Sequence, residues 1–176
     1  TQATENAIGL RDVMDMDVGE TINAVSTMIK VFGVDAQEAF DLITVGAQRG
    51  ANKNGELLAV IEEYSPFFAS SGKSANEFIG VLVRGAEDGI YSVDKIGDAW
   101  KEFTIRLGDG SANEALEDLG FYAEDIVRKF KAGGETADLA TAEIIDALVR
   151  VDDQYEQNRL GTAFFASQWE DVQGQI

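Results

Sequence analysis

A helical hairpin pattern occurs twice between Phe32 and Phe103, and this duplication constrains the fold more than any other feature of the sequence. The first copy reads FGVDAQEAFDLITVGAQRGANKNGELLAVIEEY, and the second, from Ser71, reads SGKSANEFIGVLVRGAEDGIYSVDKIGDAWKEF. The aligned pairs, all 39 residues apart, include Gly33 with Gly72, Gly46 with Gly85, Gly50 with Gly89, Glu38 with Glu77, and Glu63 with Glu102. An ungapped match that carries glycines, acids and apolar positions together indicates a duplicated supersecondary unit.

Each copy opens with the pattern of a capped helix. Asp35 and Ser74 are followed three residues later by Glu38 and Glu77, which is the spacing of a capping box. Apolar residues then recur at i, i+3, i+4 and i+7, so one face of each helix is apolar. These faces comprise Ala36, Ala39, Phe40, Ile43 and Ala47 in the first copy, and Ala75, Phe78, Ile79, Leu82 and Ala86 in the second.

The paired glycines are predicted to pack and to end helices. Gly46 and Gly85 lie near the end of the apolar faces, where a small residue lets a second backbone approach closely. Gly50 and Gly89 come next and are predicted to be C-cap residues. Gly33 ends the helical stripe that precedes the first copy, and Gly72 is its counterpart in the second.

A second helix is predicted in each copy, and together the two helices make a hairpin. Its apolar stripe is Leu57, Ile61, Tyr64 and Phe68 in the first copy, and Val93, Ile96, Trp100, Phe103 and Leu107 in the second. We therefore expect antiparallel hairpins packed through residues that include Phe40, Phe78 and Trp100.

The rest of the chain continues the helical pattern. The segment up to about Val18 predicts a short helix and a turn, and Ser111 with Glu114 predicts a capped helix inserted after the second copy. A degenerate third copy begins at Gly120 with an offset of 48 residues from Gly72. The stretch from Asp152 to Ile176 is predicted to be one helix. Its aromatic stripe fits the core best, with a docking face as the alternative.

The predicted fold class is therefore all-α, an array of antiparallel helical hairpins. We expect a single domain over residues 1–176, with repeats at about 32–70, 71–110 and 120–151. The chain begins on Thr1 without an initiator methionine and has no signal peptide, so we expect a fragment of a longer chain. No apolar run is long enough to predict a membrane span.

Composition narrows the chemistry. The 176 residues include no cysteine and no histidine, which excludes disulfides, the usual zinc sites and Ser-His catalysis. The paired carboxylates Glu62 with Glu63 and Asp152 with Asp153 are neighbours on a helix and point about 100° apart, so neither pair forms a glycosidase site. We expect no enzyme activity, no catalytic or metal-binding residue and no cofactor.

Charge argues against nucleic acid as a direct partner. The chain carries 32 acidic and 14 basic residues, a formal net charge of −18. Binding to phosphate needs clusters of Lys and Arg, and the sequence has none. A solvated acidic surface is the favoured interpretation.

Two long stretches resemble the core of phage tail tape-measure proteins. They are DAQEAFDLITVGAQRGANKNGELLAVIEEYSPFF and SANEFIGVLVRGAEDGIYSVDKIGDAWKEFTIRLGDGS, and with the preceding VFGVDA they cover the chain from near Val31 to Ser111. The resemblance implies a structural protein of long-tailed bacteriophages or prophages. In that family, tail assembly chaperones gather the chain, the tail tube protein polymerises around it, and tail length follows chain length. The chain then leaves the tube ahead of the DNA during injection.

The resemblance thus implies partners and a location. The partners are the tail tube protein and the tail assembly chaperones, and self-association stays open. The location is the inside of the tail tube in the virion, and the host cytoplasm during assembly. The repeating glycines break any sustained heptad, so both an extended ruler and a compact module stay open. The alternative is a general α-helical repeat module that binds a protein partner.

Overall fold

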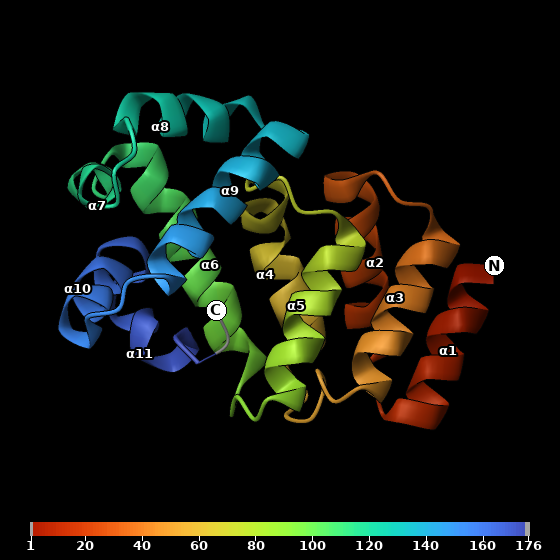
Figure 1. The fold of residues 1–176 in the computed structure, drawn as a ribbon. Coiled ribbons are helices and arrows are strands. Elements are labelled where there is room, and N and C mark those ends of the chain that lie inside the picture. The colour runs from red at the N-terminus through yellow and green to blue at the C-terminus, as the bar shows by residue number, and fades with distance from the viewer. Residues whose placement is uncertain (1, 175–176) are drawn as a thin grey trace. The chain divides into compact units, whose positions relative to one another are not determined.

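The computed structural model describes residues 2–174, and every regular element among them is a helix. In chain order the elements are α1 (Gln2–Met14), α2 (Val18–Phe32), α3 (Ala36–Gln48), α4 (Leu57–Ser70), α5 (Ala75–Glu87), α6 (Val93–Asp109), α7 (Asn113–Asp118), α8 (Ala123–Ala132), α9 (Gly134–Val149), α10 (Gln154–Phe165), the 3₁₀ helix η1 (Ala166–Gln168) and α11 (Trp169–Val172) (Figure 1). The predicted all-α class is confirmed for these residues. None of the described helices is both long and apolar enough to cross a membrane.

The chain divides into two compact units. Unit 1 contains the residues up to Pro66 together with Ser74–Gly97, and unit 2 contains Phe67–Lys73 together with the residues from Asp98 onward. Two of the boundaries fall inside α4 and α6, so each of these helices contributes residues to both units, and the third lies between Lys73 and Ser74, just before α5. The predicted repeats 32–70 and 71–110 are consequently both shared between the units, and the single domain stays a prediction.

Unit 1 stacks its repeats through their first helices. The helices α1, α3 and α5 lie side by side, and α2 packs against both α1 and α3 (Figure 1). Phe40 and Phe78 are buried on the predicted apolar faces, and the Phe78 ring lies 5.8 Å from the ring of Phe32. A bidentate ion pair from Arg49 to Glu87 links the ends of α3 and α5, with bonds of 2.9 and 3.0 Å.

Unit 2 is built around an aromatic core. The Phe103 ring has its centroid 5.2 Å from that of Phe165, 5.8 Å from Trp100, 6.1 Å from Phe164 and 6.2 Å from Phe130. The helix α8 packs closely along α9, and α10 contacts both α7 and α9. The hairpin of α8 and α9 has a shorter loop than the two before it, because Gly133 alone separates its helices.

The predicted cap of the inserted helix is wrong. The helix α7 begins at Asn113, and its N-cap residue is Ala112, which makes no side-chain cap bond. The Ser111 backbone N–H instead donates to the Asp109 carboxylate at 2.8 Å, because the chain turns at Gly110 with φ +87°. This turn places Ser111 ahead of the helix start.

The prediction of one helix from Asp152 to Ile176 is also wrong. The helix α10 ends at Phe165, the backbone breaks at Ala166 with φ 52° and ψ −141°, and a 3₁₀ turn leads into α11. The break folds the Trp169 indole back onto α10, where its Nε1 donates to Asn158 at 3.0 Å. Gln175 and Ile176 lie outside the described residues.

The core interpretation of the C-terminal stripe is confirmed for most of its members. Leu160, Phe164, Phe165, Trp169 and Val172 are buried in the core of unit 2. Tyr155 is the exception, with 82% of its surface exposed in the first turn of α10.

Candidate functional site

The described residues hold no group of His, Cys, Asp and Glu side chains that could bind a metal ion. The acidic pairs Glu62 with Glu63 and Asp152 with Asp153 are all exposed. Asp153 is a helix cap, because its carboxylate accepts a hydrogen bond of 2.8 Å from the backbone N–H of Glu156. The features that stand out in the structure are glycines and polar side chains at helix ends.

Gly50 and Gly89 end the first helix of each copy with the same turn. Both have φ +94°, and each lies one residue beyond the C-cap. The Gly50 N–H donates to the carbonyl of Ala47 at 3.2 Å, and the Ala51 N–H donates to the carbonyl of Gly46 at 3.0 Å. The turn at Gly89 repeats these two bonds at 3.4 and 2.9 Å. This is the Schellman motif, which satisfies the last free carbonyls of a helix.

Gly46 and Gly85 are buried where other side chains need their space. A Cβ at Gly46 would lie 3.3 Å from Ile79 Cγ2 and 3.4 Å from Leu57 Cδ2. A Cβ at Gly85 would lie 2.2 Å from Cδ1 of Ile96, which is in the second helix of the same hairpin. In both places a side chain, rather than the second backbone expected from the sequence, fills the space.

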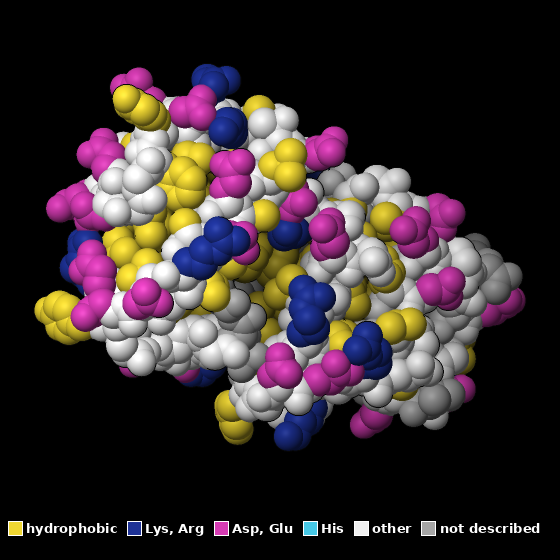
Figure 2. Space-filling view, in the orientation of Figure 1, with side chains coloured by type: hydrophobic (Ala, Val, Ile, Leu, Met, Phe, Trp, Pro, Cys, Tyr) yellow, Lys and Arg dark blue, Asp and Glu magenta, His cyan; other side chains and the backbone are white. Residues whose placement is uncertain are grey.

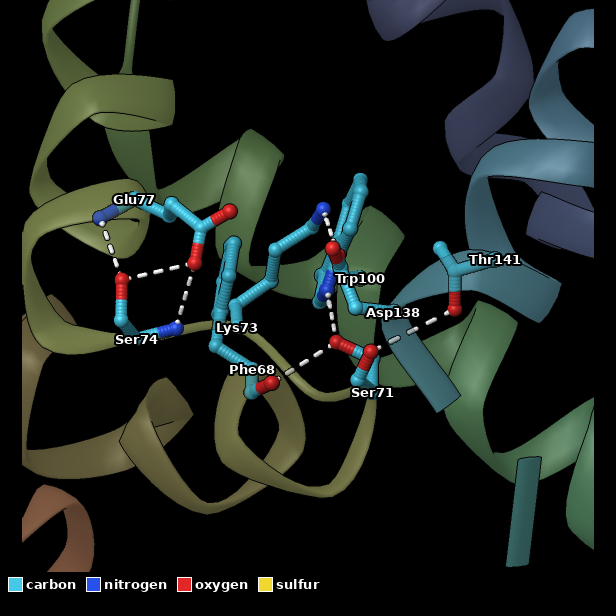
Figure 3. Close-up of polar contacts among 8 residues, drawn as sticks. All are labelled: Phe68, Ser71, Lys73, Ser74, Glu77, Trp100, Asp138 and Thr141. Carbon is cyan, nitrogen blue, oxygen red and sulfur yellow. Dashed lines mark hydrogen bonds and ion pairs between the residues drawn. The ribbon is translucent and has the colours of Figure 1, made fainter. Parts of the chain in front are cut away.

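The capping box expected in both copies is complete in the second copy, and the first copy has the Asp35 half of it. Ser74 and Glu77 form a full capping box: the Glu77 N–H donates to Ser74 Oγ at 3.2 Å, and the Ser74 N–H donates to the Glu77 carboxylate at 2.8 Å (Figure 3). In the first copy, the Asp35 carboxylate accepts a bond of 2.9 Å from the backbone N–H of Glu38. Each of these bonds satisfies a backbone N–H of the first helical turn.

Gly33 and Gly72 occupy equivalent positions of the repeat, but their turns and surroundings differ. Gly33 has φ +73° and donates to the carbonyl of Ile29 at 3.0 Å, and a Cβ there would meet nothing within 4 Å. Gly72 has φ +88°, and a Cβ there would lie 2.3 Å from the carbonyl oxygen of Gly134 and 2.4 Å from the backbone nitrogen of Asp138. Gly72 is therefore pressed against the backbone of α9.

The segment Phe67–Lys73, which we call the Ser71 turn, is held to the rest of unit 2 by a buried hydroxyl. The Ser71 Oγ donates to the carbonyl of Phe68 at 2.7 Å and accepts from Trp100 Nε1 at 2.8 Å (Figure 3). The Ser71 carbonyl accepts a bond of 3.4 Å from the Thr141 hydroxyl. Ser71 is completely buried. These bonds therefore satisfy polar groups that water cannot reach.

An ion pair and a ring stack complete the Ser71 turn. The Lys73 ammonium contacts the Asp138 carboxylate of α9, and both side chains are largely buried, with 17% and 30% of their surfaces exposed (Figure 3). The Phe68 ring stacks on the Trp100 indole with a centroid distance of 5.0 Å and an interplanar angle of 8°. The turn is thus fixed to both α6 and α9.

Sequence reasoning found part of this cluster. Gly72 and Trp100 were predicted, as a helix stop and a core residue, but Ser71, Lys73, Asp138 and Thr141 were not. Asp138 and Thr141 lie 65 to 70 residues from their partners, so no local pattern joins them. One signal was present: the repeat aligns Ser71 with Phe32, which marks a polar residue at an apolar position.

Ion pairs perturb a few exposed groups. The pKa of Asp125 is lowered by hydrogen bonds from Lys129 and Arg128, and the pKa of Glu156 is lowered by a hydrogen bond from Arg159. Exposed pairs of this kind contribute little to stability. They lie on the surface and mark no reactive group.

Comparison with known proteins shows that this sequence is similar to phage tail proteins. The family described as "Phage-related minor tail protein" matches residues 1–165. The "Probable tape measure protein" of Streptomyces phage phiC31 is 33% identical to this chain over 172 residues, which are 96% of the chain and 24% of that protein. The chain thus spans about a quarter of the length of this curated relative. No solved structure matches the chain.

Proposed function

Because the chain belongs to the phage-related minor tail protein family, we propose that it is a structural segment of a tape-measure protein that takes part in tail assembly and in tail-length determination. We also propose that the tape-measure protein leaves the tail during DNA injection. The observation that carries this proposal is the similarity to a probable tape measure protein over 96% of the chain.

The structure supports a mechanical role for the segment. The described residues bring together packing glycines, helix caps and a buried hydrogen-bonded turn, all of which stabilise a shape. The chain has neither histidine nor cysteine to offer as a nucleophile, a general base near neutral pH or a metal ligand. Such a chain is suited to a structural role during assembly.

The proposed partners are the tail tube protein and the tail assembly chaperones. Acidic side chains are spread over the visible face in Figure 2, with fewer Lys and Arg among them, in keeping with the net charge of −18. Association is steered by opposite charge, so we expect partner surfaces that are basic where they contact this chain. The proposed location is the inside of the tail tube, after synthesis and assembly in the host cytoplasm.

The test follows the chain through injection. An epitope tag is placed on the full-length protein in the phage that encodes it, and labelled tails are counted by immunoelectron microscopy after gentle opening, before and after triggered DNA ejection. We expect the tag inside intact tails and its loss from emptied tails. A tag on the tube protein, which stays in place, is the control. Tails that lack the chain before ejection, or keep it afterwards, would contradict the proposal.

A further inference from the structure

We propose that this segment stays folded in the assembled tail, as a compact module of helical hairpins, and does not extend into a continuous helix. This inference rests on the proposed function, because it concerns the chain inside a tail. Three independent features of the described residues support the folded form.

The first feature is the backbone at the helix ends. The glycines that follow the helices have positive φ, which stops a right-handed helix and reverses the chain: Gly33, Gly50, Gly72, Gly89, Gly110, Gly120 and Gly133. Glycine also disfavours the interior of a helix. Extension would place all of these glycines inside one helix. It would also lose the Schellman turns at Gly50, Gly72, Gly89 and Gly120 and the capping box at Ser74.

The second feature is the depth of burial. Both units enclose large apolar side chains with almost no exposed surface, including Ile43, Leu57, Phe78 and Leu82 in unit 1 and Phe68, Phe103, Leu107, Phe164 and Phe165 in unit 2. A single extended helix covers only part of each side chain, so extension would return most of this surface to water. The folded state keeps it buried without help from a partner.

The third feature is polar and joins distant parts of the sequence. Lys73 contacts Asp138, and Ser71 bonds to Trp100 and Thr141 inside unit 2. Extension would break these contacts and separate their partners. In a continuous helix Lys73 and Asp138 would be about 100 Å apart, at ~1.5 Å per residue.

The Lys73–Asp138 pair gives a direct test for unit 2. A water-soluble carbodiimide joins a contacting amine and carboxylate as an amide, so it reports contact without a spacer. Intact wild-type virions are treated, and the tape-measure protein is examined by denaturing gel and by mass spectrometry. We expect a linked Lys73–Asp138 peptide from protein that runs at the mass of one chain. The Asp138→Asn variant, which keeps the shape of the side chain, is the matched control and should lose the link.

A cysteine pair gives the equivalent test for unit 1. The protein segment has no cysteine of its own, and a Cβ at Gly46 would lie 3.3 Å from Ile79 Cγ2. Sulfur atoms at these two positions are therefore within reach of a disulfide. Virions that carry Gly46→Cys with Ile79→Cys are oxidised, and we expect an intramolecular disulfide. In an extended helix the two positions would be about 50 Å apart, and neither single variant can form the link.

Free full-length protein, purified away from other tail proteins, is treated in parallel. Links in both the free protein and the virion support the inference. Links in the free protein that are lost in virions, or that appear there only at the mass of two chains, overturn it. Absence of both links in the free protein overturns the inference too, because the Lys73–Asp138 and Gly46–Ile79 contacts on which it rests would then not exist. Absence of the protein from virions overturns the proposed function instead, and the inference with it.

Discussion

At the scale of single residues, glycine has two separate roles in this chain. Gly46 and Gly85 leave room for neighbouring side chains within ordinary helices, whereas Gly33 and Gly72 adopt positive φ at helix ends. The repeat predicted all four positions, because it preserves them at a fixed spacing. It did not predict that α9 presses on Gly72, since that contact comes from residues more than 60 positions later.

The Gly72 contact predicts unequal costs at equivalent positions. Gly33→Ala should cost about 1–2 kcal/mol, the usual penalty for a side chain in the left-handed region. Gly72→Ala should cost about 3 kcal/mol or more, because its Cβ also collides with backbone atoms that cannot rotate away. Urea denaturation of the two variants measures the difference, and equal losses would contradict the close approach at Gly72.

Packing at Gly85 gives a second prediction. Gly85→Leu should lower the free energy of unfolding by roughly 1–3 kcal/mol, because Ile96 already fills the space that the new side chain needs. The matched control is Gly80→Leu in the same helix, where the nearest atom to a Cβ is the Arg84 Nη1 at 3.6 Å. That variant should be neutral or more stable. A denaturation midpoint that rises in Gly85→Leu would show that the site is open.

At the scale of elements, local sequence signals located most helix ends, and tertiary contacts decided the others. The starts of α3 and α5 followed from Asp35 and Ser74, whose side chains bond within their own first turn. The break at Ala166 could not be predicted in this way. The break accompanies the packing of the Trp169 indole on Gly161, where a Cβ would lie 2.2 Å from the ring.

Strain at that break leads to a third prediction. Ala166 adopts φ 52° and ψ −141°, a conformation that essentially only glycine tolerates, and such strain costs of order 1–3 kcal/mol. Ala166→Gly should therefore raise the free energy of unfolding by about 1 kcal/mol. Ala163→Gly, inside α10, should lower it by about the same amount. Thermal denaturation of both variants checks this, and a loss of stability in Ala166→Gly would refute the strained turn.

At the scale of the whole chain, the repeat predicted the all-helical class, but it did not predict how the helices group into units. The segment Phe67–Lys73 belongs to unit 2, whereas the residues on either side of it belong to unit 1. Ser71 and Lys73 join this segment to partners on α6 and α9. None of those contacts is periodic. Sequence patterns describe neighbours within one helix or one repeat. The grouping into units instead follows contacts between residues far apart in the sequence, which such patterns do not describe.

Net charge gives a fourth prediction. With −18 formal charges, the protein segment should cause no retardation of duplex DNA at physiological salt. The measurement is a gel-shift titration, with a basic DNA-binding domain as the positive control. Retardation that disappears on addition of salt would mean that Lys and Arg side chains gather into a phosphate-binding surface after all.

The most direct test of the folded tape-measure segment keeps chain length constant and changes only the fold. Residues 32–70 of the full-length protein are replaced in the phage by a glycine-free helical sequence of equal length and charge, and tail lengths are measured by electron microscopy. The control replaces exposed residues only, keeps the glycines and buried positions, and should leave tail length unchanged. If the natural hairpin is packaged folded, the straight helix should lengthen tails by a large part of ~60 Å, at ~1.5 Å per residue. Tails of unchanged length would contradict the account of a folded segment that helps to set tail length, because residues 32–70 would then either be extended already or have no part in setting that length.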